Sequence, residues 1–250
     1  MAKLKGKVAV VTGASKGIGA AIAEKLGSEG ARVVVNYARD KAGAEKVAEK
    51  INRSGGEAIA VQADVSKAED IKKLFAETMR AFGNVDILVN NAGVYEFRPL
   101  ESVDEEHFRK IFDLNVLGLL LTTKEAVTHM NGQGGSIINV SSIAAKTPAA
   151  NTSVYSATKG AVDVISRTLA LELAPRKIRV NSLSPGATET EGVRAMPEYA
   201  NGFTQIAISR TPLGRLGTAE DIAKAALFLA SEDSGWVTGE ELLVGGGIRL

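Results

Sequence analysis

Tyr155 and Lys159 stand four residues apart at the end of the stretch SSIAAKTPAANTSVYSATK, which runs from Ser141. If a helix begins near Val154, residues four apart share a face, so the Lys159 ammonium can approach the Tyr155 phenol. A free Tyr has a pKa of roughly 10, and a cation about 4 Å away at an effective dielectric of about 20 would lower it to roughly 7. The helix dipole acts in the same direction. The spacing predicts a phenol that exchanges a proton with a carbonyl or alcohol oxygen near neutral pH, although such a pair is also common on helix surfaces.

Composition limits the classes of function. The chain has 250 residues, of which 45% are apolar and 24% charged, so we expect residues 1–250 to form a single domain. Thirty basic residues against 29 acidic ones give a net charge of +1, which favours neither nucleic acid nor an anionic membrane as a partner. The sequence has no apolar stretch as long as a signal peptide or a membrane-spanning helix, and it has no cysteine. We therefore predict a cytoplasmic protein.

Metal chemistry is not indicated by the sequence. The absence of cysteine excludes disulfides, thiolate metal sites and cysteine nucleophiles. The two histidines, His107 and His129, are 22 residues apart and lack a supporting ligand motif. We expect no metal site.

A glycine-rich turn follows the first apolar run, Lys7 to Thr12. After this turn, apolar residues recur at helical spacing before a second β-branched run, Arg32 to Asn36. The glycine spacing is G-x-x-x-G-x-G, and such small residues let a backbone approach a pyrophosphate at a helix N-terminus. The candidate cofactor-binding residues of the turn are Gly13, Ser15, Lys16, Gly17, Ile18 and Gly19.

Helical and strand patterns then alternate along the chain. The predicted helices are 41–54 and 68–82, and the predicted strands are 57–62, 86–89, 135–140, 178–183 and 241–244. This alternation predicts an α/β fold with a doubly wound sheet, whose ligands bind at the carboxyl edge of the strands. Candidate residues at that edge are Asp64, Val65, Asn91, Ala92, Gly93, Pro185, Gly186 and Thr188.

Several residues of these segments admit two interpretations. Asp64 could accept the amine of an adenine, or it could cap a helix. A helix is predicted over 105–130, in which Asn115 could be structural, or could break the helix locally and hold a water. A further helix carries Tyr155, and another covers 219–230. The segment 189–211, with Val193, Met196, Tyr199, Phe203 and Ile206, is a loop or a substrate lid.

Taken together, these motifs resemble those of short-chain dehydrogenases/reductases over essentially the whole chain. The motifs occur in the order of that family: Thr12-Gly13-x-x-x-Gly17-x-Gly19, Asn90-Asn91-Ala92-Gly93, Asn115, Ser142, Tyr155-x-x-x-Lys159 and Pro185-Gly186. The closest subgroup contains 3-oxoacyl-acyl-carrier-protein reductases and sugar or ketone reductases. The resemblance implies a single-domain Rossmann fold with seven parallel strands, helices on both faces, and a nicotinamide cofactor.

The resemblance also implies a catalytic set of Asn115, Ser142, Tyr155 and Lys159. In it Tyr155 donates the proton, Ser142 orients the substrate oxygen, Lys159 lowers the pKa of Tyr155 and holds the nicotinamide ribose, and Asn115 positions a water. Ser141 is one residue too far from Tyr155 for the family spacing and is assigned to structure. The expected enzyme reduces a ketone or aldehyde carbonyl reversibly.

Two other classes of function remain open. A non-catalytic dinucleotide sensor could share the fold, but the retention of Tyr155 and Lys159 argues against it. A serine hydrolase could use Ser142 with Lys159 as the base, but the chain lacks a G-x-S-x-G elbow.

NADP(H) is the expected cofactor. NAD-selective sheets carry an acidic residue near the end of the second strand, where this chain reads Asn36-Tyr37-Ala38-Arg39. Arg39 and Lys16 can form charge-assisted hydrogen bonds to a 2′-phosphate. Asp40 follows the strand and precedes a helix, so we interpret it as an N-cap. Tyr37, Ala38 and Arg39 join the predicted cofactor site.

The substrate and the assembly are less constrained. An acidic acyl-carrier protein would favour a basic pocket mouth, to which Arg176 and Lys177 could contribute. Residues 128–133 offer no Lys or Arg, so we favour a small or medium ketone or aldehyde over a carrier-bound thioester. A sugar dehydrogenase is a further alternative. A homotetramer is implied by the family resemblance, with helices 105–130 and 154–174 pairing, and the apolar, glycine-rich end 242–250 at a second interface.

Overall fold

The computed structural model describes residues 2–130, 132–194, 202 and 204–248. Within these residues, one sheet of parallel strands has the order β3-β2-β1-β4-β5-β6-β9. The order reverses between β1 and β4, which is where such sheets bind ligands. The strands are β1 (Val8–Val11), β2 (Arg32–Tyr37), β3 (Glu57–Gln62), β4 (Ile87–Asn90), β5 (Gly135–Val140), β6 (Ile178–Pro185) and β9 (Glu241–Val244).

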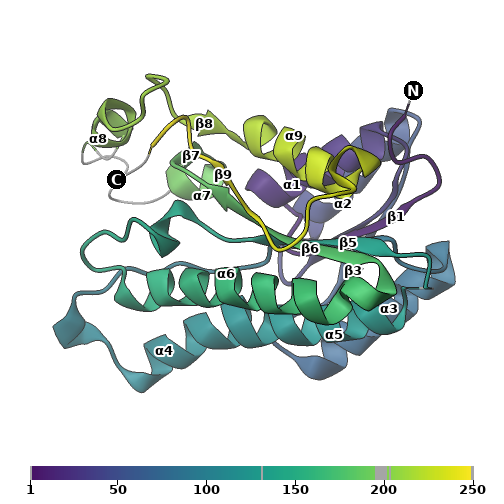
Figure 1. Cartoon of the computed structure of the whole chain (residues 1–250), viewed down its shortest axis with the longest axis horizontal. Coiled ribbons are helices and arrows are strands. Elements are labelled where there is room, and N and C mark those ends of the chain that lie inside the picture. The colour runs from purple at the N-terminus through teal and green to yellow at the C-terminus, as the bar shows by residue number, and fades with distance from the viewer. Residues whose placement is uncertain (1, 131, 195–201, 203, 249–250) are drawn as a thin grey trace.

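Helices cover both faces of the sheet (Figure 1). One face carries α1 (Gly17–Ser28), α2 (Lys41–Arg53) and α9 (Ala219–Ala230). The other carries α3 (Ala68–Phe82), α4 (Glu105–Phe112), α5 (Leu119–Thr128) and α6 (Ser153–Leu173). The predicted α/β fold, with a doubly wound, seven-stranded parallel sheet, is confirmed.

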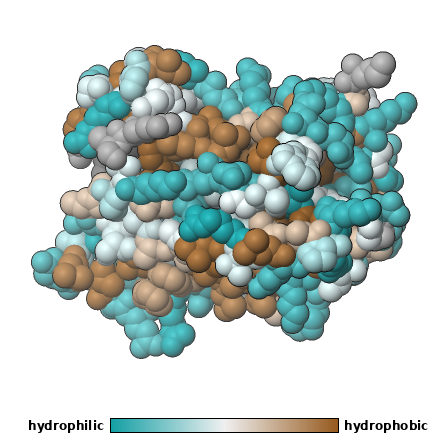
Figure 2. All heavy atoms as spheres, viewed as in Figure 1, coloured by the Kyte–Doolittle hydropathy of each residue, from teal (hydrophilic) through white to brown (hydrophobic). Residues whose placement is uncertain are grey.

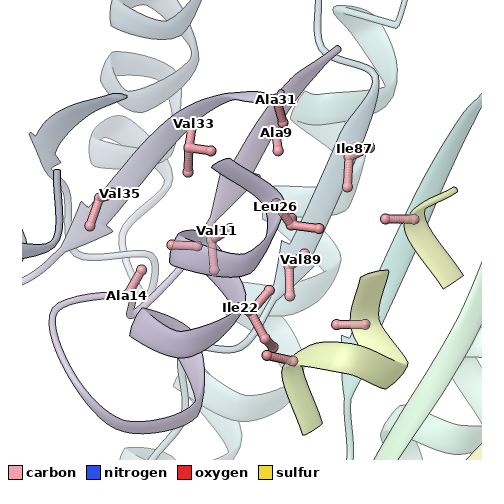
Figure 3. Packing of buried hydrophobic residues seen from close by; sticks show 14 of the residues in the cluster. Ala9, Val11, Ala14, Ile22, Leu26, Ala31, Val33, Val35, Ile87 and Val89 are labelled. Carbon is pink, nitrogen blue, oxygen red and sulfur yellow. The ribbon is translucent and has the colours of Figure 1, made fainter. Parts of the chain in front are cut away.

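Alternate residues of the central strands enter two separate cores. Val11 and Ala9 pack with Leu26 and Ile22 of α1, as Figure 3 shows, whereas Val10 lies in the core on the opposite face. All of these side chains are fully buried. Because both faces of β1 are covered, its sequence is continuously apolar rather than alternating. Shifting the strand by one residue would exchange its two sets of side chains, so this packing fixes the register.

Buried amides tie the sheet to the helices of one face. The Asn90 amide donates to Thr123 Oγ1 of α5 and to Asn139 Oδ1 of β5, at 2.9 Å each. The Asn139 amide donates in turn to Ser166 Oγ of α6 at 2.9 Å. Because an unpaired buried amide is costly, this chain of hydrogen bonds fixes α5 and α6 relative to the strands that they flank.

The helix predicted over 105–130 is interrupted. A π-helical turn, Asp113–Gly118, separates α4 from α5, and Asn115 lies within it. The wider i→i+5 turn adds a residue to the helix and is common at functional sites. The helical region predicted over 105–130 is therefore confirmed as α4, the π-helical turn and α5. The alternative that Asn115 breaks the pattern locally is also confirmed, while the water that it would hold stays a prediction.

Short elements after β6 complete the fold. A two-stranded parallel pair, β7 (Thr188–Glu189) and β8 (Gly217–Thr218), was not predicted from the sequence. Helices α7 (Glu191–Arg194) and α8 (Thr204–Ser209) occupy the predicted lid segment, in which Met196, Tyr199 and Phe203 lie outside the described residues. In the described part of the chain, no helix has the length and apolar character needed to cross a membrane.

Candidate active site

The turn between β1 and α1 is held by the side chain of Asn36. This residue is fully buried at the end of β2, and its Oδ1 accepts a hydrogen bond from the Gly13 N–H at 3.2 Å. Its amide donates to the carbonyls of Val61 and Ala63, at 3.3 and 3.0 Å. Asn36 therefore fixes the glycine turn against β3. From the sequence, Asn36 indicates only that the end of β2 carries no acid.

A second amide closes the turn from the other side. The Asn91 amide donates to the carbonyls of Thr12 and Gly13, at 2.9 and 3.0 Å. A Cβ on Gly19 would lie only 2.4 Å from Asn91 Nδ2, and a Cβ on Gly13 only 2.9 Å from the Ala92 Cα. The glycines are required because the two turns touch at the switch point between β1 and β4.

The start of α1 is suited to a pyrophosphate. Gly13 and Gly17 have φ angles of 61° and 60°, which favour glycine. Lys16 is the N-cap of α1 but provides no side-chain cap, so the first N–H groups of the helix are free to bind an anion. Ser15 and Ile18 of the same turn are partly buried. The residues present therefore fit a bound dinucleotide.

Two cations lie on the turns that follow β1 and β2. Arg39 and Lys16 are exposed, and neither forms an ion pair with another residue of the described ranges. Asp40 Oδ1 accepts the Gly43 N–H at 3.0 Å, which confirms Asp40 as the N-cap of α2. Tyr37 is buried and Ala38 exposed.

Asp64, after the end of β3, does not cap a helix as one interpretation of the sequence predicted. Asp64 Oδ1 accepts hydrogen bonds from the N–H and hydroxyl of Ser66, at 3.1 and 2.7 Å, and so closes a local turn. The N-cap of α3 is Lys67, so the interpretation of Asp64 as a helix cap is wrong. Val65 is buried, and its carbonyl lies against Gly118 of the π-helical turn.

The π-helical turn fixes the segment after β4. Asn115 is buried, and its Oδ1 accepts the Val94 N–H while its amide donates to the Val94 carbonyl, both at 2.9 Å. The amide also donates to Thr158 Oγ1 of α6 at 3.2 Å. Gly93 leaves a gap next to Asn115, since a Cβ there would be 3.2 Å from Asn115 Oδ1 and 3.8 Å from Lys159 Nζ. Asn115 thus links three segments of the site.

Lys159 is a buried cation. Its side chain is 7% exposed, and Nζ donates to the Val140 carbonyl at the end of β5, at 2.9 Å. Burial lowers the pKa of Lys159 to about 8, and the nearby Asp163 carboxylate opposes this shift. Nζ lies 5.7 Å from the centre of the Tyr155 ring. The ammonium therefore lies beside the Tyr155 ring.

The pKa of Tyr155 moves in the opposite direction from the prediction. Burial raises it, while a hydrogen bond with Ser142 partly offsets the effect. Lys159 does not lower it, because the Lys159 ammonium is bound to the Val140 carbonyl and beside the ring. The prediction of a phenol that titrates near roughly 7 is wrong for this geometry, since it counted the attraction of the cation without the cost of desolvation.

Ser142 and Ser141 face different surroundings. The Ser142 hydroxyl bonds with Tyr155 and also accepts the Ala144 N–H at 3.1 Å. Ser141 is buried and donates to the Lys159 carbonyl at 3.2 Å. The structure therefore places Ser142, not Ser141, beside the phenol.

A pair of acids lies behind Lys159. Asp163 is one turn further along α6 and is 5% exposed, with Oδ1 unpartnered. Burial raises its pKa, as does the Glu241 carboxylate on β9, while hydrogen bonds with Ser141 and Ser182 lower it. Glu241 forms an ion pair with Lys146 at 2.6 Å. Neither acid was singled out from the sequence, because they meet only through the pairing of β6 with β9.

The turn after β6 completes the site at the carboxyl edge of the sheet. Gly186 approaches Gly245 so closely that a Cβ would lie 2.7 Å from the Gly245 Cα, and Thr188 Oγ1 donates to the Gly186 carbonyl at 3.0 Å. Pro185 ends β6. Thr190, which sequence analysis missed, lies beside Gly17, whose Cβ would be 3.6 Å from it. The predicted residues at the ends of β1, β4 and β6 thus converge on one edge.

Two aromatic residues at the site were also missed. Tyr95 and Phe97 have ring centres 6.3 and 6.1 Å from that of Tyr155. They alternate with the charged Glu96 and Arg98, and this alternation was the only available signal. Elsewhere in the described residues, no three acidic or histidine side chains are grouped so that they could hold a metal ion.

Comparison with known proteins identifies the relatives of this chain. Residues 13–249 match a family model described as enoyl-(acyl carrier protein) reductase. An uncharacterised oxidoreductase of Methylorubrum extorquens is 55% identical over all of both chains. Versicolorin reductase 1 of Aspergillus parasiticus is 43% identical, covering 98% of this chain and 97% of its own. The crystal structure of an angucycline C-6 ketoreductase with bound NADP has a TM-score of 0.91 and 37% identity, covering 98% of this chain and 96% of its own.

The acids behind Lys159 lead to a prediction about its pKa. Asp163→Asn removes the carboxylate that stabilises the ammonium, so the pKa of Lys159 should fall below about 8. Glu241→Gln should lower the pKa of Asp163 itself, because it removes a neighbouring negative charge. NMR titration of ¹³C-labelled lysine would follow Lys159 directly. An unchanged or raised pKa of Lys159 in Asp163→Asn would contradict this coupling.

Proposed function

Because the chain belongs to the short-chain dehydrogenase/reductase family, we propose that it is an NADPH-dependent reductase that transfers a hydride to a ketone or aldehyde carbonyl. The observation that supports this most is the Tyr155 phenol, hydrogen-bonded with Ser142 and one helical turn from the buried Lys159. The family is one of oxidoreductases, and a similar ketoreductase binds NADP.

Each residue of the site has a proposed role. Tyr155 gives its proton to the carbonyl oxygen, and Ser142 orients that oxygen by a hydrogen bond. Lys159 supplies a positive charge beside Tyr155 and would hold the nicotinamide ribose. Asn115 fixes Val94 and α6 around the substrate, and its proposed water would connect Lys159 to solvent. The nicotinamide, when bound, supplies the hydride.

The preferred direction follows from the pKa of Tyr155. Because burial raises this pKa, the phenol holds its proton at neutral pH and is ready to donate it. Alcohol oxidation needs the phenolate, so it should require a more alkaline solution. We therefore propose that the reaction is reversible but works mainly as a reduction at neutral pH.

Tyr155→Phe tests the proton donor. The substitution removes one hydroxyl and should lower kcat for ketone reduction by about 10²- to 10⁴-fold. NADPH affinity, measured by fluorescence titration, should be nearly unchanged. Ser141→Ala is the matched control, because its hydroxyl bonds only with groups behind the site, and it should retain much more activity. Substantial activity of Tyr155→Phe with saturating cofactor would refute the assignment.

The preference for NADPH is proposed from charge. Arg39 and Lys16 are exposed at the end of β2 and the start of α1, and Asp40 is occupied as a helix cap. A 2′-phosphate would therefore meet two cations and no competing free acid in this turn. The proposed cofactor site contains Gly13, Ser15, Lys16, Gly17, Ile18, Gly19, Tyr37, Ala38, Arg39, Asp64, Val65, Asn91, Ala92, Gly93, Tyr155, Lys159, Pro185, Gly186 and Thr188.

Arg39→Ala and Lys16→Ala test this preference. Loss of a charge-assisted contact worth about 1.5 to 3 kcal/mol should lower kcat/KM with NADPH by roughly ten- to a hundred-fold and barely change it with NADH. Arg53→Ala, at the far end of α2, is a control whose cation pairs with Glu49. A parent enzyme that prefers NADH would show the proposal to be wrong.

We propose a small or medium ketone as the substrate, rather than a carrier-bound thioester or a sugar. Lys177 immediately precedes β6, at the amino edge of the sheet, while the site lies at the carboxyl edge. Arg176 donates to the Val127 carbonyl at 2.6 Å. Neither cation can therefore guide a carrier protein to the site, contrary to the sequence-based suggestion. The possible lid 189–211 and a cytoplasmic location also remain proposals.

The alternative classes of function find less support. In a serine hydrolase, Lys159 would activate Ser142, but Lys159 Nζ binds the Val140 carbonyl, and Ser142 bonds with Tyr155. A dinucleotide sensor would not need the half-buried proton donor. Spectrophotometric NAD(P)H oxidation with a panel of carbonyl compounds separates these classes. Neither nucleic acid nor a membrane is proposed as a partner.

A homotetramer is proposed from exposed apolar side chains on the helices that were expected to pair. Figure 2 shows apolar side chains gathered over α6 and the helices beside it. These residues would lie in water in an isolated chain, and a face of this kind marks an interaction surface. They are Phe108, Leu117, Leu120, Val164 and Leu171. β9, at the open edge of the sheet, would contribute to the second interface.

Leu171→Glu tests the assembly. Leu171 is 79% exposed in the isolated chain, and a charge there should dissociate the tetramer into smaller species. Light scattering at micromolar concentration measures the mass. Leu100→Glu, at a residue 77% exposed but outside α4, α5 and α6, should leave it unchanged. A stable monomer of the parent protein would refute the proposal.

A further inference from the structure

The segment after β4 alternates two kinds of side chain. Glu96 and Arg98 point to α4: the Glu96 carboxylate pairs with Lys110 and with Arg98, at 2.6 Å each, and Arg98 pairs with Asp104 at 3.1 Å. Tyr95 and Phe97 instead meet the Tyr155 ring. The charged and the aromatic side chains of this segment therefore contact different neighbours.

The backbone of this segment is fixed on both sides of the aromatic residues. Asn115 binds both the N–H and the carbonyl of Val94. At the other end, the Arg98 N–H donates to the Asn151 carbonyl at 2.9 Å. The hydrogen bonds from Lys110 and Arg98 lower the pKa of Glu96 to about 2, so its carboxylate remains ionised at the pH of any ordinary assay. The two rings are thus presented from a preorganised support.

The rings form one surface across the site. Tyr95 and Phe97 are 6.0 Å apart at an interplanar angle of 32°, and they stand at 81° and 64° to the Tyr155 ring. They remain 40% and 37% exposed. Gly192 of α7 borders this surface, since a Cβ there would lie 3.0 Å from the Tyr95 hydroxyl. A molecule whose carbonyl oxygen reaches Tyr155 must therefore lie alongside this pair of rings.

The chemistry of this surface selects among substrates. The charges of Glu96 and Arg98 are neutralised on the opposite side of the segment, so a charged or many-hydroxyl substrate gains no partner from them. Exposed aromatic faces favour a flat, polarisable ring by stacking and by excluding water. A flexible aliphatic chain covers less of such a surface.

We propose that Tyr95 and Phe97 form an aromatic wall that holds the ring system of a flat aryl or fused-ring ketone beside Tyr155 and thereby determines substrate selectivity. The inference depends on the proposed ketone reduction and specifies its substrate class. Replacing either ring with Leu retains an apolar side chain but removes the flat face. The wall therefore predicts a loss that depends on the shape of the substrate.

The test compares two methyl ketones, 2-acetylnaphthalene and cyclohexyl methyl ketone, with the full-length enzyme and NADPH. Tyr95→Leu and Phe97→Leu should each lower kcat/KM for the naphthyl ketone by about 3- to 10-fold, mainly through KM, and change that for the cyclohexyl ketone less than about 2-fold. Taking the ratio of the two ketones in each variant cancels their different intrinsic reactivity. Phe97→Tyr keeps the flat ring and should retain the preference.

Phe228→Leu is the matched control, because Phe228 on α9 is 38% exposed, close to the value for Phe97. It should leave both ketones unaffected. If Tyr95→Leu and Phe97→Leu lower kcat/KM equally for both ketones, so that the ratio of the two values is unchanged, the proposed aromatic wall is wrong.

A binding measurement separates the wall from the reaction. 2-Naphthol is flat and has no ketone to reduce, and calorimetry with the NADP⁺-loaded enzyme should show its Kd weakened about 3- to 10-fold in Phe97→Leu. If no ketone is reduced but this dependence is found, the proposed function fails and the wall stands. If ketones are reduced but neither the ratio nor the Kd responds, the wall fails and the proposed reaction stands.

Discussion

The burial of the Lys159 ammonium is the constraint around which the site is arranged. Taking an ammonium out of water costs several kcal/mol, and here its charged form is supported by the Val140 carbonyl and the charge of Asp163. Asp163 is also buried, and is repelled by Glu241, which pairs with Lys146. The two acids thus lie between two lysines, Lys159 on α6 and Lys146 in the loop after β5. Each part of this chain limits how the next can move.

Side-chain amides fix the turns at the carboxyl edge of the sheet. Turns at the ends of strands leave backbone groups that no strand or helix satisfies, and buried groups of this kind must find partners. Asn36 binds the glycine turn, Asn91 binds Thr12 and Gly13, and Asn115 binds Val94. Because an amide both donates and accepts, it can replace a missing strand neighbour. The edge that would hold the dinucleotide is therefore rigid before any ligand arrives.

The sequence predicted the features that repeat along the chain. Continuous apolar strands such as β1, and helices such as α3, could be located closely because many residues share the pattern. The π-helical turn, the β7–β8 pair and the meeting of Asp163 with Glu241 could not, because each depends on a few residues brought together by the fold. The pKa of Tyr155 was predicted in the wrong direction since a sequence contains the cation but not the degree of burial. Tyr95 and Phe97 were missed because their segment belongs to no helix or strand and so carries no periodic pattern.

The structure also separates two requirements of a reductase that would otherwise conflict. The proton donor needs a buried site that keeps its pKa high, as desolvation does for Tyr155, but a substrate must still reach it. The segment carrying Tyr95 and Phe97 resolves this, because its charged side chains are bound by α4 and its rings border an open approach to the phenol. In the proposed mechanism, the strand ends and α6 provide the geometry of proton transfer, while a short loop segment selects the substrate. Substitutions in that segment can then alter selectivity without disturbing the buried charges on which the reaction depends.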